Sequence, residues 1–210
     1  MILGIETATE ICSVALVRGT EVLADRSVNE KNIHSERLLS LVDEMLKETG
    51  HSVMEIEGIA VSIGPGSFTG LRIGLSTAKG LAMARSIPIY AVPTLDGIAE
   101  SFRRKNVAGI AEKFCSMVDA KRNESFFALY DISAEGIQRN TPDMIRLKEE
   151  IISEAQKHHA TVEQPGVSAV SIALLAEKNG KEYKVSDFSQ LEPSYLRDFV
   201  ATTPRKEIIH

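Results

Sequence analysis

The chain has 210 residues, of which 43% are hydrophobic and 25% are charged, as in ordinary globular proteins. Its net charge of −5 at pH 7 lacks the basic excess expected of a protein that binds nucleic acid on its own. Met1 is followed by no basic segment or cleavage signal, and no apolar stretch approaches membrane-spanning length. We therefore expect a cytoplasmic protein that does not bind a membrane.

The first half of the sequence alternates strand patterns and helix patterns. Three segments at 2–5, 11–17 and 21–28 predict an antiparallel meander. The predicted elements that follow are helices at 35–49, 69–85 and 94–105 and strands at 59–63 and 89–92. This order predicts a mixed five-stranded sheet with helices on it.

The second half is sparser in apolar residues. It contains predicted strands at 114–118 and 125–130, a hairpin connection at 131–136, and helices at 143–158 and 168–177. No low-complexity linker separates the halves, so we expect two tightly apposed lobes. The expected division is a first lobe at 1–100 and a smaller second lobe at 101–210, with a C-terminal tail that can return to the first lobe.

A glycine-rich segment at 64–74 follows the strand predicted at 59–63 and opens a predicted helix. Strand, glycine loop and helix in this order bring backbone N–H groups to an anion. The segment is not a P-loop, and three residues separate Gly66 from Gly70 where the dinucleotide fingerprint has two. Ser67 directly follows Gly66, so it is no nucleophile elbow either. Two interpretations stay open: anion binding, and a tight turn with close helix packing.

Two polar loops are further candidates for phosphate contacts. The turn at 6–9 follows the first strand, and the loop at 119–124 joins two strands of the second half. Such turns can cradle a phosphate through N–H and hydroxyl groups, although composition alone favours a plain hairpin turn for each of them. The candidate residues for a vestigial phosphate site are Glu6, Thr7, Thr9, Gly64, Gly66 and Asp119.

No catalytic set of side chains can be assembled from the sequence. Cys12 and Cys115 lie in apolar runs and are expected to be buried as small hydrophobic residues. No two histidines have the i, i+4 spacing of a metal-binding helix. We predict neither catalytic residues nor a metal site.

The segments at 5–9, 64–74, 119–121 and 193–197 together resemble the TsaB (YeaZ) family, a bacterial branch of the actin/hexokinase/Hsp70-like superfamily. The resemblance covers nearly the whole chain. It implies a two-lobed, actin-like (RNase H-like) α/β fold. It also implies a role in forming N6-threonylcarbamoyladenosine at position 37 of tRNAs that read ANN codons.

The resemblance further implies the partners. These are the transferase TsaD, the ATPase TsaE through the complex with TsaD, and a second copy of the chain when TsaD is missing, whereas tRNA is contacted only indirectly. TsaD carries a His-x-x-x-His metal motif after the next strand, and the two histidine positions fall here on Thr94 and Ile98. Neither side chain replaces an imidazole ligand. The implied role is a non-catalytic partner without a cofactor of its own, and a weak or shared nucleotide site at the partner interface stays open.

The expected partner surface combines two helices. The helix at 35–49 has an apolar face wider than one sheet usually covers, and the helix at 69–85 has a row of small residues that allows close approach. The expected interface residues are Leu38, Leu39, Leu41, Val42, Met45, Leu46, Gly70, Gly74 and Ala78. Leu39 and Leu46 are expected to point outward as anchors. The alternative function is a small ATP-dependent phosphotransferase or hydrolase that uses Glu6 and Asp119 around a metal-bound phosphate.

Overall fold

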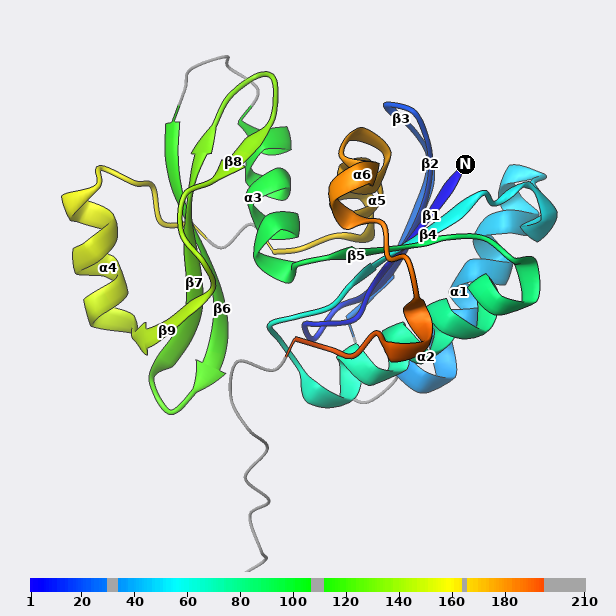
Figure 1. The fold of residues 1–210 in the computed structure, drawn as a ribbon, viewed down its shortest axis with the longest axis horizontal. Helices are drawn as coiled ribbons and strands as arrows, with labels where there is room; N and C mark the ends of the chain where they lie inside the picture. The colour runs from blue at the N-terminus through cyan, green and yellow to red at the C-terminus, as the bar shows by residue number, and fades with distance from the viewer. Residues whose placement is uncertain (30–33, 107–111, 164–165, 195–210) are drawn as a thin grey trace, which may run out of the picture.

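A computed structural model describes residues 1–29, 34–106, 112–163 and 166–194. The first sheet has five strands in the order β3-β2-β1-β4-β5, and β1–β4 and β4–β5 pair in parallel while β1–β2 and β2–β3 pair antiparallel. The strands are β1 (Ile2–Glu6), β2 (Cys12–Arg18), β3 (Glu21–Val28), β4 (Gly58–Ser62) and β5 (Ile89–Val92). The predicted mixed five-stranded sheet is confirmed (Figure 1).

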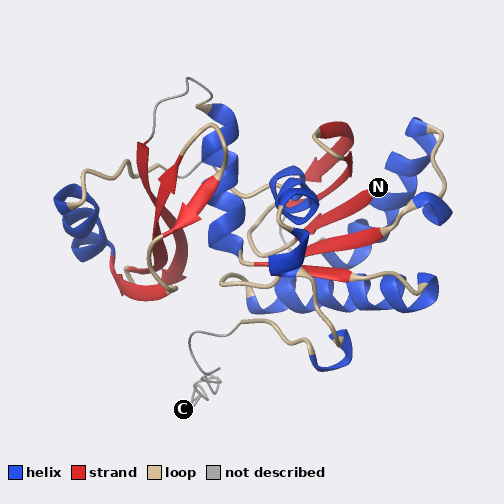
Figure 2. Cartoon of the chain, turned by 45° about the horizontal axis from the view of Figure 1, so that its top comes forward, coloured by secondary structure: helices blue, strands red, loops and turns tan. Residues whose placement is uncertain are grey.

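Helices cover both faces of the first sheet, so β1 and β4 are buried along their whole length and have near-continuous apolar sequences. The helices α1 (His34–Thr49) and α2 (Phe68–Arg85) lie on one face, where they share a core with Leu3, Ile5 and Val61. The helix α5 (Ala169–Lys178) lies on the other face against β1, β2 and β4 (Figure 2). The glycine segment therefore begins at the carboxyl end of a fully buried strand.

A second sheet is built from β6 (Glu112–Lys121), β7 (Glu124–Ile132), β8 (Ile137–Arg139) and β9 (Met144–Leu147). The prediction of one helix over 143–158 is wrong in its first turn. Residues 144–147 pair antiparallel with β7, and the helix α4 begins only at Lys148 and ends at Lys157. The free edge of β7 offers backbone partners to this stretch, and those pairings override its helical pattern.

The two sheets share one hydrophobic core. The helix α3 (Thr94–Lys105) lies between them with α5, and its Phe102 stacks on Phe114 of β6 with 4.1 Å between ring centroids. Because α5 packs on the first sheet, the chain after residue 101 contributes to both lobes. Apolar side chains from both sheets thus belong to one cluster with those of α3 and α5. Figure 1 shows these two helices between the sheets.

The last described residues run back along the first lobe. After α6 (Gly180–Tyr183), the backbone N–H of Val185 donates to the carbonyl of Ile89 at 2.9 Å. After the 3₁₀ helix η2 (Phe188–Gln190), the N–H of Ser194 donates to the carbonyl of Ile63 at 2.7 Å. Tail residues 195–197, part of the resemblance, lie outside the described residues.

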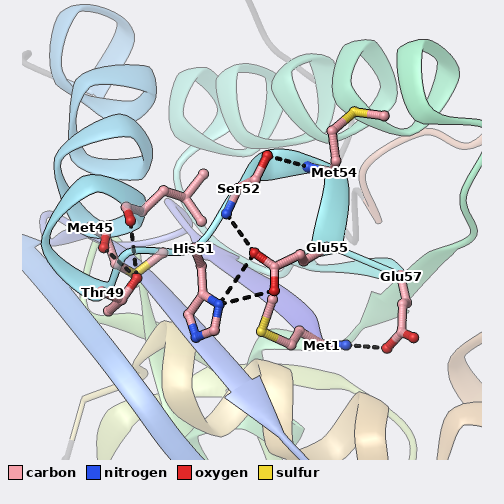
Figure 3. A network of polar contacts seen from close by, with 9 residues as sticks. Met1, Met45, Thr49, His51, Ser52, Met54, Glu55 and Glu57 are labelled. Atoms are coloured by element: carbon pink, nitrogen blue, oxygen red, sulfur yellow. Dashed lines mark hydrogen bonds and ion pairs between the residues drawn. The ribbon is translucent and has the colours of Figure 1, made fainter.

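A polar network fixes the connection from α1 to β4 (Figure 3). Gly50 follows the last residue of α1 with φ +68°, the left-handed conformation that a helix C′ position favours. The 3₁₀ helix η1 (Val53–Glu55) carries a capping box, in which the Ser52 N–H donates to Glu55 Oε2 at 2.7 Å and Ser52 Oγ accepts from Met54 N at 3.2 Å. The connection is held by its own side chains.

In the part of the chain that the structure describes, no helix combines the length and apolarity needed to cross a membrane.

Candidate functional site

The glycine segment packs directly onto the turn between β1 and β2. A Cβ atom at Gly70 would lie 2.0 Å from the carbonyl oxygen of Thr7, and one at Gly74 would lie 2.2 Å from Thr7 Oγ1. A Cβ atom at Gly66 would lie 2.4 Å from the carbonyl oxygen of Ala8. Real Cβ atoms do not come this close to other atoms, so the backbone of the turn requires glycine at 66 and 70, and the Thr7 side chain requires it at 74.

Hydrogen bonds within the chain use several polar groups of this segment. The Thr7 hydroxyl donates to the carbonyl of Gly70 at 2.8 Å, and the N–H of Ser67 donates to the carbonyl of Ala8 at 2.7 Å. Ser67 caps α2 by accepting from the N–H of Gly70 at 3.2 Å. Of the two interpretations left open by the sequence, this geometry supports the tight turn with close helix packing. Anion binding at the segment stays a prediction.

Glu6 ends β1 with its side chain fully buried. Its Oε1 accepts from the N–H of Ala8 at 2.6 Å, whereas its Oε2 is buried without a hydrogen-bond partner in the described part of the chain. Burial raises the pKa of Glu6 from 4.5 to about 7, although Ser62 on the neighbouring strand lies close enough to lower it in part. Ser62 is not aligned as a hydrogen-bond donor, and its Oγ is also buried without a partner in the described residues. Glu6 is thus an interior carboxyl group.

The other predicted phosphate residues are only partly brought together. Gly64 has φ +117° and is covered by the carbonyl of Ser194, which would lie 2.8 Å from a Cβ atom there. Thr9 is half-buried in the β1–β2 turn. Asp119 belongs to the second lobe, where its exposed carboxylate pairs with Lys148 Nζ at 3.0 Å. The structure therefore gathers five of the six candidates at the carboxyl edge of the first sheet and pairs Asp119 within its own lobe.

A pocket of about 350 Å³ lies where β2, β3, α3 and the start of α5 meet. Its polar lining comes from Ser13, Asp25, Ser27, Ser101, Arg104, Lys105 and Ser168. None of the six predicted phosphate residues lines it. Sequence reasoning missed this pocket because its walls come from four separated segments, none of which carries a motif.

The expected partner surface is mostly interior. The buried members are Leu38, Leu41, Val42, Met45, Leu46, Gly70, Gly74 and Ala78. The expectation that Leu46 points outward is wrong, because it is only 8% exposed in the core beneath α1. The wide apolar face is covered by β2, β3 and α2 of the same chain. Leu39 alone of the nine is strongly exposed, at 57%.

A buried polar cluster includes the start of α3, the segment that occupies the place of the transferase's metal motif. Thr94 and Ile98 are buried at the start of α3. Between them, the Asp96 carboxylate accepts from the hydroxyl of Tyr130 at 2.8 Å and from that of Tyr183 at 3.1 Å. It also pairs with the guanidinium of Arg139 at 2.7 Å. This cluster joins α3, the second sheet and α6, and the sequence analysis did not single it out.

The two cysteines are buried, as predicted. Burial raises the pKa of the Cys12 thiol to about 11, with a further contribution from Glu6, and raises that of Cys115 to about 12. Both therefore stay as uncharged thiols at neutral pH.

Comparisons with known proteins agree with this architecture. Residues 21–153 match the family model described as TsaD, tRNA N6-adenosine threonylcarbamoyltransferase. The chain is 38% identical over 153 residues to the tRNA threonylcarbamoyladenosine biosynthesis protein TsaB of Escherichia coli, a match that covers 73% of this chain and 64% of that protein's length. The TsaB of Bacillus subtilis is 28% identical over 219 residues, which cover 93% of each chain.

Among solved structures, YeaZ from Pseudomonas aeruginosa superposes with a TM-score of 0.78 at 23% identity, over 93% of this chain and 99% of that chain. The fold accordingly defines a two-lobed α/β protein of the actin-like (RNase H-like) class. Within that class, the chain belongs to the TsaB (YeaZ) family.

Proposed function

We propose that this chain is a non-catalytic partner of TsaD in the cytoplasmic formation of N6-threonylcarbamoyladenosine at position 37 of tRNAs that read ANN codons. One observation carries the proposal: in a chain matched by the TsaD family model, the glycine segment is filled by Thr7 and Ala8 of the same chain. In addition, Thr94 and Ile98 stand at the histidine positions of the transferase motif and are buried. The chain thus keeps the fold of the transferase family, and TsaD carries out the threonylcarbamoyl transfer.

The proposed contact surface is the outer side of α1 and α2. Leu39 offers a large exposed side chain on α1, and Met83 offers another on α2 with 71% exposure. Exposed apolar side chains on two neighbouring helices suit a helical partner surface. TsaE joins through the complex, tRNA is contacted indirectly, and the same surface pairs two copies of the chain when TsaD is absent.

The test uses purified chain mixed with purified TsaD and analysed by size-exclusion chromatography. Replacing Leu39 by Glu should abolish the complex without unfolding the chain, because the residue is exposed. Leu147→Glu is the matched control, since Leu147 is 44% exposed in the second lobe. A complex that survives Leu39→Glu would exclude this surface, and threonylcarbamoyl transfer by the chain alone would overturn the non-catalytic role.

The alternative of an ATP-dependent phosphotransferase or hydrolase draws no support from the geometry. It requires Glu6 and Asp119 around one metal-bound phosphate, yet Glu6 is fully buried and Asp119 pairs with Lys148. Calorimetric titration of the isolated chain with Mg-ATP tests this alternative directly, and measurable heat of binding would favour it.

A further inference from the structure

The second lobe contains a pocket of about 380 Å³ on the side of its sheet that faces α4. Its floor is formed by the edge of Leu129, which is 7% exposed, with Phe127 on the same face of β7 fully buried beneath it. Met144 of β9 lies beside Phe127 in the strand register and forms a wall. Helix α4 covers only part of this face, with Ile151 and Ala155 in the core, so the pocket opens beside the helix. Its volume is in the range of small-molecule sites.

The mouth of the pocket carries an excess of positive charge. Lys113 of β6 and Arg146 of β9 are exposed and line it, and neither side chain has an ion pair or hydrogen bond within the described residues. The acidic residue of the lining, Glu154, already lies 3.4 Å from His158 Nε2 and 3.7 Å from Lys157 Nζ. Asp131 lies opposite Lys113 in the strand register but outside the pocket lining, so the lining itself carries two cations and one carboxylate that is already paired.

The lining also supplies polar groups near the floor. Asn140 and Thr141 follow β8 and line the pocket. Thr141 Oγ1 accepts from the N–H of Leu129 at 2.9 Å, which fixes this wall against the strand. An apolar cavity with a few converging polar groups is the usual form of a small-molecule site. The positive charge at its mouth favours a negatively charged ligand.

We propose that this pocket binds a small amphipathic anion, namely a molecule with an aromatic or aliphatic body and one carboxylate. The body lies against Met144 and the edge of Leu129, and the carboxylate lies between Lys113 and Arg146. The site is in the lobe opposite to α1 and α2, as Figure 1 shows by the places of α4 and α1. It is therefore independent of the proposed partner surface.

The test is calorimetric titration of the full chain with 3-phenylpropionate, with a Kd expected on the order of 0.1 mM for a ligand of this size. The neutral 3-phenylpropanamide should bind at least about tenfold more weakly, because it lacks the charge that the two cations select. Amide shifts in NMR spectra should localise at Phe127 and Leu129. Absence of binding, or equal binding of the neutral amide, would overturn the proposal.

Variants separate the local charges from the net charge. Lys113→Glu and Arg146→Glu should each weaken binding at least about tenfold. Lys181→Glu on α6 makes the same charge change at an exposed residue outside the pocket and should leave binding unchanged. An equal loss in this control would overturn the site. If a Glu variant fails to fold by circular dichroism, Lys113→Gln and Arg146→Gln provide the same comparison, and unchanged affinity in both would likewise overturn it.

Discussion

Thr7 and Gly70 hold the first turn of the sheet against the start of α2. The Thr7 hydroxyl donates to the Gly70 carbonyl at 2.8 Å. The Thr7 carbonyl oxygen lies only 2.0 Å from the position that a Cβ atom of residue 70 would take. The segment for which the sequence leaves both anion binding and close packing open is thus packed against the chain's own turn.

Adding a methyl group to this segment should destabilise the chain. Gly70→Ala and Gly74→Ala each place a Cβ atom within 2.2 Å of Thr7, so we expect each to lower the free energy of unfolding by about 3 kcal/mol or more. Gly80→Ala is the control on the same helix, because nothing lies within 4 Å of its Cβ position. It should be neutral or stabilise by up to about 1 kcal/mol, since Ala favours helix. Urea unfolding followed by circular dichroism measures all three, and equal effects would contradict the packing.

Glu6 should make stability depend on pH. Its pKa is 4.5 when free of the fold and about 7 when buried, so the folded chain binds the proton more tightly. Between these values the unfolded chain has lost its proton while the folded chain keeps it, and the contribution of Glu6 to stability falls as pH rises. The loss is complete above about pH 7 and amounts to roughly 3 kcal/mol at most.

The variant Glu6→Gln isolates this effect from all other titrations. It keeps the shape of the protonated side chain and removes the charge. We expect wild type and variant to unfold at similar urea concentrations at pH 4.5 and the variant to be the more stable one at pH 8. A wild type that is more stable than the variant at pH 8 would show that the buried group is a favourable carboxylate.

The two leucines expected to anchor a partner should behave differently in the chain alone. Leu46→Glu places a charge in a site with 8% exposure and should cost about 3 kcal/mol or more, or prevent folding. Leu39→Glu changes a side chain that is 57% exposed and should alter stability by less than about 0.5 kcal/mol. Thermal unfolding of the two variants compares them directly. Similar melting temperatures would contradict the orientation of α1.

Asp96 should be essential for joining α3 to the second lobe. Asp96→Ala leaves the buried hydroxyls of Tyr130 and Tyr183 without their acceptor and leaves Arg139 with Asp143 as its remaining carboxylate, which should cost about 2 kcal/mol or more. Asp43→Ala removes an exposed ion pair with Lys47 and should cost less than about 1 kcal/mol. Denaturant unfolding of both variants provides the test, and a small effect at Asp96 would assign the stability of the junction to its apolar contacts.

The sequence by itself determined the local elements and the family. The apolar runs and the glycines at turns predicted the five strands of the first sheet and the helices α1, α2 and α3. Such predictions succeed because the spacing of apolar residues and the helix caps depend on residues only a few positions apart. Segment 64–74 indicated the family because its glycines are required by contacts specific to this fold.

Only the tertiary structure decided which apolar faces are interior and which elements meet. Leu46 is buried because α1 packs on two strands and α2 together, and residues 144–147 form a strand because β7 has a free edge. Asp96 finds Tyr130, Tyr183 and Arg139 over separations of 34 to 87 residues, and no local pattern encodes such a meeting. Long-range packing has no period in the sequence, so it becomes visible only when the chain is folded.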